Sequence, residues 1–190
     1  MSIYLTGKLV RLRAVEPEDA EIIFEWENNT DIWLISTTLA PFSKDEIIRY
    51  VKTANRDIFA MRQLRLMIET NDNQAVTIGS VDLFDFDPQH QRAGVGILIA
   101  ADENRRKGYA SEALKLLINY SFDVLLLKQL YCTIPADNES SIKLFESLGF
   151  VTCGRKRQWL RTKTGWIDEI LMQLINPTEL KGGALSKALH

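Results

Sequence analysis

The sequence predicts a single α+β domain in which a central sheet is flanked by helices. Three observations support this fold class. The chain has 190 residues, a length that suits one domain with one large core. Its hydrophobic content of 46% and charged content of 25% are ordinary for a globular protein. Its segments are expected in the order strand, two helices, three strands, helix, strand, helix and two strands.

The first half of the chain is expected to hold one strand, two helices and three further strands. Residues 8–13 alternate with a period of two, as a strand does. A helix follows with Pro17 in its first turn and ends at Asn28–Asn29, and a second helix begins at the capping-box sequence 43–46. The three strands are expected at 64–69, 75–84 and 91–100.

The second half is expected to continue with a long helix from residue 109, of which the apolar run 124–127 forms the buried end. A strand should follow at 130–135, and then a short capped helix that stops at Gly149. The last strands are expected at 152–160 and 166–175. The domain is thus predicted to cover residues 1–175, followed by a C-terminal tail at 176–190.

A basic turn, Arg105-Arg106-Lys107-Gly108, stands between an apolar strand and a helix. The first N–H groups of a helix lack partners and carry partial positive charge, so they can bind a diphosphate where no bulky side chain blocks it. Gly108 would provide that clearance. The alternative interpretation is a basic helix start that merely faces solvent. Neither the P-loop signature nor G-x-G-x-x-G after a strand is present.

The pattern Arg105-x-x-Gly108-x-Ala110 resembles the acetyl-CoA pyrophosphate signature of the GCN5-related N-acetyltransferases. About thirty residues later, Asn138 and the pair Gly149–Phe150 stand where this family has an asparagine and a Gly-Phe pair. The resemblance covers roughly residues 8 to 175. It is strongest to the branch of spermidine N-acetyltransferases and ribosomal-protein N-terminal acetyltransferases. It implies the acyl-CoA N-acyltransferase fold, with a mixed, mostly antiparallel sheet, and acetyl-CoA as co-substrate.

The resemblance also implies where acetyl-CoA would bind. In the family the pantetheine arm lies between two splayed strands, here 95–100 and 130–134, and a main-chain N–H of Leu98 or Ile99 would polarise the thioester carbonyl. The spacer between Ile99 and Arg105 is one residue longer than usual, so a bulge is expected at Ala100–Ala101. The expected cofactor-binding residues are Ile97, Leu98, Ile99, Arg105, Arg106, Lys107, Gly108, Tyr109, Ala110, Asn138, Ser141 and Lys143.

The acceptor amine must lose a proton before it can attack the thioester. A polyamine amine with a pKa of about 10.4 costs roughly 4.6 kcal/mol to deprotonate at pH 7, whereas a protein N-terminus costs about 1 to 1.4 kcal/mol. Asp82 and Asp85 stand where a cationic acceptor is expected, although a solvated strand end explains them equally well. Trp33 lies in the loop that borders acceptor pockets in the family. His90 could relay a proton or be an ordinary surface residue.

Two positions depart from the spermidine enzymes. Phe145 stands in place of their tyrosine general acid, and Gly94 in place of a glutamate, so the catalytic acid and base stay unassigned. The prediction is an acetyl-CoA-dependent N-acetyltransferase that acts on a primary amine, with a polyamine-like acceptor slightly preferred. The alternatives are a protein N-terminal acetyltransferase and a non-catalytic acyl-CoA-binding module.

The bulk properties limit the possible partners. A net charge of −2 gives no general attraction to nucleic acid or to an anionic membrane. No secretory signal or membrane-spanning apolar run is visible, so a cytoplasmic location is expected. Cys132 and Cys153 are too few for a disulfide framework or a metal site, and Cys132 reads as a buried filler of a strand. A late hairpin rich in Trp, Leu and Ile makes a homo-oligomer plausible.

Overall fold

The computed structural model describes residues 5–30, 33, 39–54 and 57–178. Its seven-stranded sheet has the order β1-β2-β3-β4-β5-β7-β6. Only β4 and β5 run parallel, and every other neighbouring pair is antiparallel, which confirms the α+β class with a mixed, mostly antiparallel sheet. The strands are β1 (Val10–Ala14), β2 (Leu64–Thr70), β3 (Thr77–Asp87), β4 (Arg92–Ile99), β5 (Gln129–Pro135), β6 (Val151–Thr162) and β7 (Gly165–Ile175).

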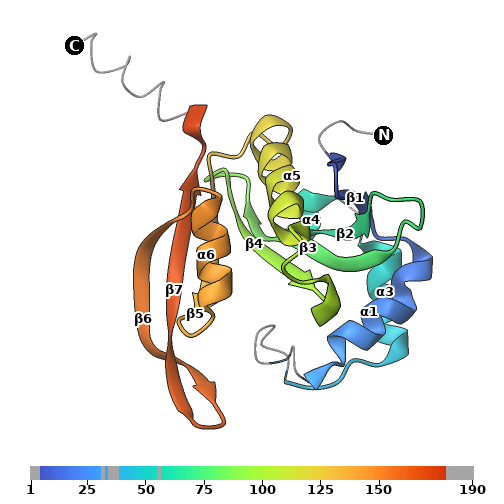
Figure 1. The fold of residues 1–190 in the computed structure, drawn as a ribbon, viewed down its shortest axis with the longest axis horizontal. Helices are drawn as coiled ribbons and strands as arrows, with labels where there is room; N and C mark the ends of the chain where they lie inside the picture. Colours follow the sequence, from blue (N-terminus) through green and yellow to red (C-terminus); the bar gives the residue numbers. More distant parts are fainter. Residues whose placement is uncertain (1–4, 31–32, 34–38, 55–56, 179–190) are drawn as a thin grey trace.

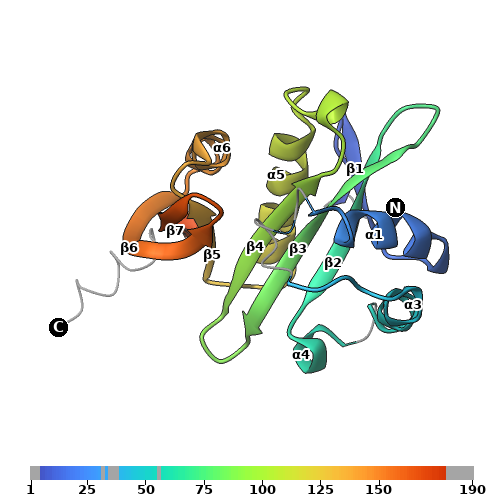
Figure 2. The same ribbon diagram turned by 90° about the horizontal axis from the view of Figure 1, so that it is seen from below.

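Helices cover both faces of the sheet (Figures 1 and 2). On one face α5 lies over the β1–β4 half and α6 over the β5–β7 half, and on the other face α1 and α3 lie against the first half. The helical segments are the 3-10 turns η2 (Pro17–Asp19) and η3 (Asp102–Asn104) and the α-helices α1 (Ala20–Glu27), α3 (Lys44–Thr53), α4 (Ile58–Met61), α5 (Tyr109–Asp123) and α6 (Glu139–Ser147).

The two layers of helices create two hydrophobic clusters. The larger one lies under α5 and α6 and includes Leu66 of β2 and Leu114 of α5. The smaller one joins Ile23 of α1 and Ile47 of α3 to Met67 of β2. Successive strand residues point to opposite faces, so Leu66 and Met67 fill different clusters. The β1–β4 half of the sheet is therefore covered on both faces, whereas helices cover the β5–β7 half on one face.

Local signals place the first helices as expected. Pro17 begins a 3-10 turn that leads directly into α1, and Asn28 is the C-cap of that helix. Ser43 and Glu46 form a complete capping box at α3, in which the Glu46 N–H donates to Ser43 Oγ at 3.2 Å and the Ser43 N–H donates to Glu46 Oε2 at 2.8 Å. The capping prediction is confirmed.

The prediction that residues 124–127 form the buried end of the helix is wrong about the helix, although Leu127 itself is buried, at 2% exposed. Helix α5 stops at Asp123, and Leu126 is 69% exposed with a positive φ of 54°. The N–H groups of Leu125 and Leu127 donate to the carbonyls of Tyr120 and Ser121. The run therefore wraps around the end of α5 and satisfies its last carbonyl groups, because these have no partner within the helix.

Two smaller differences concern connections. The expected bulge at Ala100–Ala101 is absent, because the Ala100 N–H continues the ladder by donating to Ile78 O at 3.0 Å, and the chain between Ala101 and Arg105 forms η3. The short helix α4 was not anticipated by any periodic pattern. No helix in the ranges that the structure describes is long and apolar enough to span a bilayer.

Candidate active site

The parallel strands β4 and β5 separate part of the way along their length. They share only the pairs Arg92↔Gln129, Ala93↔Leu130 and Gly94↔Tyr131. Beyond these pairs β4 stays bonded to β3 as far as Ile99, and β5 stays bonded to β7 as far as Pro135. Figure 1 shows the two ribbons diverging. Residues 95–99 and 132–135 therefore border an opening in the sheet, here called the strand opening, and the splay implied by the family resemblance is confirmed.

Every second residue of β4 points its main-chain N–H and C=O groups toward this opening. The Ala100 N–H donates to Ile78 O, and a Cβ on Gly79 would collide with Leu98 O, so Leu98 and Ala100 direct their main-chain groups to β3. Backbone direction alternates along an antiparallel strand, so Ile97 and Ile99 direct theirs into the strand opening. Of the two amides expected to face a thioester, the structure thus favours Ile99 over Leu98.

Both flanking helices begin at the same end of the strand opening. Helix α5 follows β4 through η3, and α6 follows β5 after a short turn. Because β4 and β5 are parallel, the two helix N-termini lie at the edge where both strands end. Their partial positive charges therefore flank the wide end of the opening, which favours an anion there.

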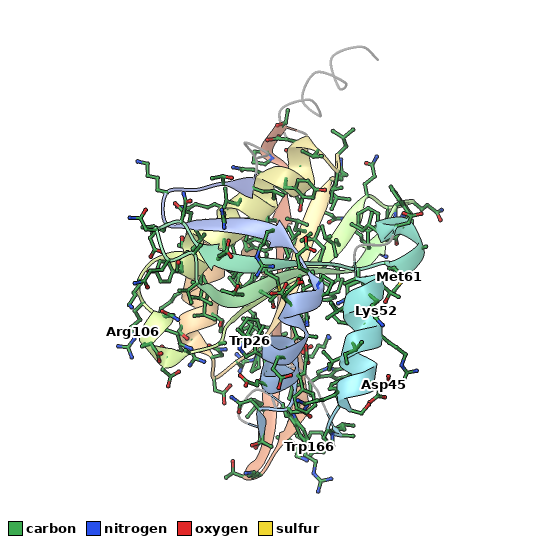
Figure 3. The ribbon with its side chains drawn as sticks, turned by 90° about the vertical axis from the view of Figure 1, so that its right-hand side faces the viewer. Trp26, Asp45, Lys52, Met61, Arg106 and Trp166 are labelled. Carbon is green, nitrogen blue, oxygen red and sulfur yellow. The ribbon has the colours of Figure 1, made fainter. Side chains whose placement is uncertain are left out.

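The basic turn before α5 combines a glycine in the left-handed region with exposed cations. Gly108 is the N-cap with φ of 86°, and a Cβ there would lie 3.3 Å from Leu9 Cδ1. Arg106 and Lys107 are exposed, and Figure 3 shows Arg106 at the edge of the molecule. Arg105 instead bends back, with Nη1 2.7 Å from Asp102 Oδ1 and Nη2 3.4 Å from Ile99 O. Arg105 therefore braces the turn, while Arg106 and Lys107 have no ion-pair partner among the described residues and can bind an anion.

Glu112, in the first turns of α5, is a site residue that the sequence reasoning missed. Its carboxylate accepts hydrogen bonds from the N–H groups of Lys8, Leu9 and Val10, at 3.1, 2.6 and 2.8 Å. This clamp fixes Leu9 against Gly108. An acidic residue near a helix N-terminus was visible in the sequence, but its partners 102 to 104 residues away were not.

On the other side of the opening, Asn138 caps α6. Its Oδ1 accepts from the Ser141 N–H at 3.2 Å and from Ser140 Oγ at 3.0 Å. Lys143 is exposed and paired with Glu139 at 3.0 Å on the same helix. Asn138 and Ser141 thus lie at the edge of the opening, whereas Lys143 lies along the solvent-facing side of α6.

A charged cluster lies on the face of the sheet that α1 and α3 cover. Arg65 of β2 donates through Nε to Asp82 Oδ1 and through Nη1 to Glu27 Oε1, both at 2.7 Å. The Trp33 indole donates to the main-chain oxygen of Glu27 at 2.8 Å, and the Tyr50 ring lies under Arg65. The structure thus brings the expected acceptor residues Trp33 and Asp82 together, through Glu27 and Arg65.

This cluster is poorly hydrated, and the pKa values reflect it. Burial raises the pKa of Tyr50 to about 12. Burial also opposes the charge on Arg65, but Asp82 outweighs it, with help from Tyr50 and Glu27, so the pKa of Arg65 lies above its ordinary value. Arg65 therefore stays charged. The sequence predicts that Asp82 attracts a cationic acceptor, but in the structure its negative charge is already matched by Arg65.

Asp85 lies apart from this cluster, in a pocket of about 610 Å³ beside the paired end of β4 and β5. The Tyr131 hydroxyl donates to Asp85 Oδ2 at 3.1 Å, and burial together with Asp85 raises the pKa of Tyr131 to about 12. Arg62, Asp87, Arg92, Gln129 and Gln173 also line the pocket. His90 is exposed in the turn before β4, where its N–H donates to Asp87, and so lies away from the strand opening.

At positions 94 and 145, which depart from the spermidine enzymes, aromatic rings occupy the space where the acid or base would lie. A Cβ on Gly94 would overlap the Phe84 ring, so Phe84 takes the space that a glutamate would need. Phe145 is 3% exposed and packs edge-to-face on Phe150, with ring centroids 5.0 Å apart. Burial raises the pKa of the Cys132 thiol to about 12, which keeps it protonated. None of these residues can serve as an acid, base or nucleophile.

The residues around the opening fit coenzyme A. The glycine at positive φ, two exposed cations and two helix N-termini suit a diphosphate, and the parts of β4 and β5 that do not pair with each other suit the amide-bearing pantetheine arm. Among the described residues, no group of three or more His, Cys, Asp or Glu side chains could hold a metal ion. These features define an acyl-CoA-dependent transferase.

Comparison with known proteins gives the family. Residues 10–151 match the model of the acetyltransferase (GNAT) domain, so the chain belongs to this family of N-acetyltransferases, and its co-substrate is acetyl-CoA. The spermidine N(1)-acetyltransferase of Escherichia coli (strain K12) is 29% identical over 144 residues, which are 74% of this chain and 72% of that protein.

Two solved structures are also similar. One is the spermidine N-acetyltransferase of Vibrio cholerae in complex with CoA and spermine, with a TM-score of 0.78 and 28% identity over 89% of this chain and 96% of that one. The other is a dodecameric structure of the same enzyme in an intermediate state, with a TM-score of 0.75 and 28% identity over 92% and 98%.

Proposed function

We propose that this enzyme acetylates a primary amine of a polyamine-like acceptor. The observation that carries the proposal is the cluster of Glu27, Arg65 and Asp82, in which two carboxylates share one guanidinium. With both carboxylates ionised the cluster keeps one net negative charge, which favours a cation. The similarity to spermidine acetyltransferases supports the same acceptor class.

In this proposal acetyl-CoA is held mainly by main-chain groups. The diphosphate binds the N–H groups around Gly108, with Arg106 and Lys107 adding charge, and Tyr109 and Ala110 form the first helical turn beneath it. The pantetheine arm lies in the strand opening between the edge of β4 and the start of α6. Acetyl-CoA supplies the acetyl thioester, and the Ile99 N–H polarises its carbonyl.

The acceptor approaches from the face of the sheet on which α1 and α3 lie, opposite to the face that α5 and α6 cover. Holding both reactants in one opening contributes several kcal/mol through proximity. Phe145 and Gly94 supply no acid or base, so the acceptor's proton leaves to water, and the CoA thiolate released when the thioester C–S bond breaks takes a proton from water.

A turnover screen tests the acceptor class. Thiol release from acetyl-CoA is measured with spermidine, spermine, lysine and short peptides that have free N-termini. We expect the highest kcat/KM with the polyamines. Faster turnover of the peptides would contradict the proposal.

A protein N-terminus is the second candidate acceptor. The pocket beside Asp85 has balanced charge, because Arg62 and Arg92 line it together with Asp85 and Asp87, and its glutamine side chains suit a peptide chain. Deprotonation of an N-terminus also costs about 3 kcal/mol less than that of a polyamine, which suits a site without a dedicated base. Peptides ranking first in the same screen would support this candidate.

We also propose that the enzyme self-associates. Trp159 and Trp166 of the β6–β7 hairpin are 57% and 58% exposed, and Figure 3 shows Trp166 at the tip of the molecule. Large exposed aromatic side chains are typical of interfaces. The dodecameric relative supports the proposal. Light scattering on the purified chain should give a mass above 21.7 kDa, the mass of one chain.

A further inference from the structure

Glu27 gives the charged cluster its net negative charge. Arg65 lies opposite Asp82 in the β2–β3 ladder and would by itself neutralise that carboxylate. Glu27, at the end of α1, approaches the same guanidinium from another element. We infer that Glu27 and Asp82, held around Arg65, bind the second, non-reacting ammonium group of the acceptor. This inference rests on the proposed polyamine acceptor and names the part of the site that recognises it.

The contacts leave room for such a ligand. Arg65 bonds one oxygen of each carboxylate, Oδ1 of Asp82 and Oε1 of Glu27. Within the described part of the chain, the second oxygen of each carboxylate takes no hydrogen bond. The two side chains are 16% and 22% exposed, so these oxygens are close to solvent but poorly screened. An ammonium with its three donors matches two such acceptors.

The cluster lies beside the strand opening. Asp82 pairs with Gly96 of β4, two residues beyond the last pair that joins β4 to β5. A Cβ on Gly96 would have no neighbour closer than 3.7 Å, so the backbone there is uncrowded. Arg65 is two residues from Met67, whose side chain packs under α1 and α3, so the cluster faces the side from which the acceptor approaches.

The spacing suits a short diamine. Residues rise about 3.3 Å along a strand and neighbouring strands lie about 4.8 Å apart. This spacing places the Cα atom of Asp82 about 6 Å from that of Ile97 and about 11 Å from that of Ile99. A chain of three or four methylene groups between two nitrogens, plus one hydrogen bond, spans about 8 to 9 Å. The reacting amine can thus reach a thioester in the opening while its second ammonium lies between Glu27 and Asp82.

The test compares Glu27→Gln with the matched control Glu25→Gln. Both replace a carboxylate of α1 by an amide, but Glu25 is exposed and away from the cluster. In Glu27→Gln the amide oxygen can still accept from Arg65 Nη1, and Trp33 keeps its bond because it uses the main-chain oxygen. The fold should therefore survive while the net charge of the cluster becomes zero. Thermal unfolding and CoA binding confirm the state of each variant.

The readout is kcat/KM for 1,3-diaminopropane and 1,4-diaminobutane against propylamine and butylamine. We expect Glu27→Gln to lose about tenfold or more on the diamines, chiefly through KM, and less than about threefold on the monoamines. Glu25→Gln should match the wild type on all four. Asp82→Asn, which also keeps an oxygen for Arg65, should repeat the diamine-specific loss and serves if Glu27→Gln is unstable.

Three outcomes would overturn the inference, and they differ in what else they affect. An equal loss on diamines and monoamines would mean that Glu27 only supports the fold. If the wild type prefers diamines and both Glu27→Gln and Asp82→Asn keep the wild-type kcat/KM on them, this ammonium site is refuted and the polyamine proposal stands. A wild type without any preference for diamines or polyamines would refute the proposed acceptor itself, and the ammonium site with it.

Discussion

The carboxylate of Glu112 is the most heavily used side chain near the basic turn. It accepts from three successive main-chain N–H groups of residues 8–10 and so ties the start of the chain to α5. A Cβ on Gly7 would lie 2.5 Å from Glu112 Oε2, so the chain approaches the carboxylate closely at this point. The clamp places Leu9 beside Gly108, and the shape of the turn depends on it.

Glu112→Gln should therefore lower the free energy of unfolding. The amide can accept fewer hydrogen bonds than a carboxylate and carries no charge, so we expect a loss of about 1–3 kcal/mol. Urea denaturation followed by circular dichroism measures it. The control is Glu146→Gln on the exposed side of α6, and equal stability of the two variants would contradict the role of the clamp.

Cys132 offers a second residue-level prediction. Its thiol is buried and its pKa is raised to about 12, so it stays protonated at neutral pH and cannot attack a thioester. Mass spectrometry after incubation with acetyl-CoA alone should therefore find no acetyl group on Cys132. An acetylated Cys132 that decays when amine is added would replace direct transfer by a covalent route.

At the level of elements, the sequence predicted most strands and helices but not how they pair. Caps and alternation placed α3 and β7 closely. The apolar run 124–127 is predicted to be the buried end of α5, whereas the chain turns there through Leu126 at positive φ. The ion pair from Arg65 to Asp82 depends on strand register, and that to Glu27 joins residues 38 apart. Charge balance in the site could therefore not be read from the sequence.

Two substitutions of Asn138 distinguish its role as the N-cap of α6 from a contact with acetyl-CoA. Asn138→Ala should cost about 1 kcal/mol of stability, because the N-cap bond to Ser141 is lost. Asn138→Asp keeps a capping oxygen, so it should retain stability while losing the side-chain N–H groups at the start of α6, where we propose that the pantetheine arm lies. Chemical denaturation and CoA titration are measured on both variants. Wild-type CoA affinity in Asn138→Asp would show that the amide plays no part.

For the whole molecule, three weakly acidic side chains predict sensitivity to alkaline pH: the buried Cys132 and the half-buried Tyr50 and Tyr131. Burial is the main cause that raises the pKa of Cys132 from 9.0, and those of Tyr50 and Tyr131 from 10.0, to about 12. Above about pH 9 the unfolded chain begins to lose these protons while the folded chain keeps them. The unfolded state then binds fewer protons, so the free energy of unfolding falls as the pH rises from about 9 to 12.

The melting temperature should therefore drop between about pH 8.5 and pH 10.5, and Cys132→Ala should show a smaller drop over the lower part of this range. Differential scanning fluorimetry at several pH values measures both. A melting temperature that stays constant to about pH 10.5 would mean that these groups are hydrated in the folded protein.

The central claim is that main-chain groups around Gly108 hold the diphosphate of acetyl-CoA. Titration calorimetry with CoA on wild type, Gly108→Ala and the control Gly154→Ala tests it most directly. The first variant places a Cβ at φ of 86° and 3.3 Å from Leu9, whereas at Gly154 a Cβ would meet only ordinary contacts with Leu171. We predict a Kd at least about tenfold higher for folded Gly108→Ala, equivalent to 1.4 kcal/mol, and an unchanged Kd for Gly154→Ala. Equal affinities for all three proteins, or no binding heat with the wild type, would contradict the claim.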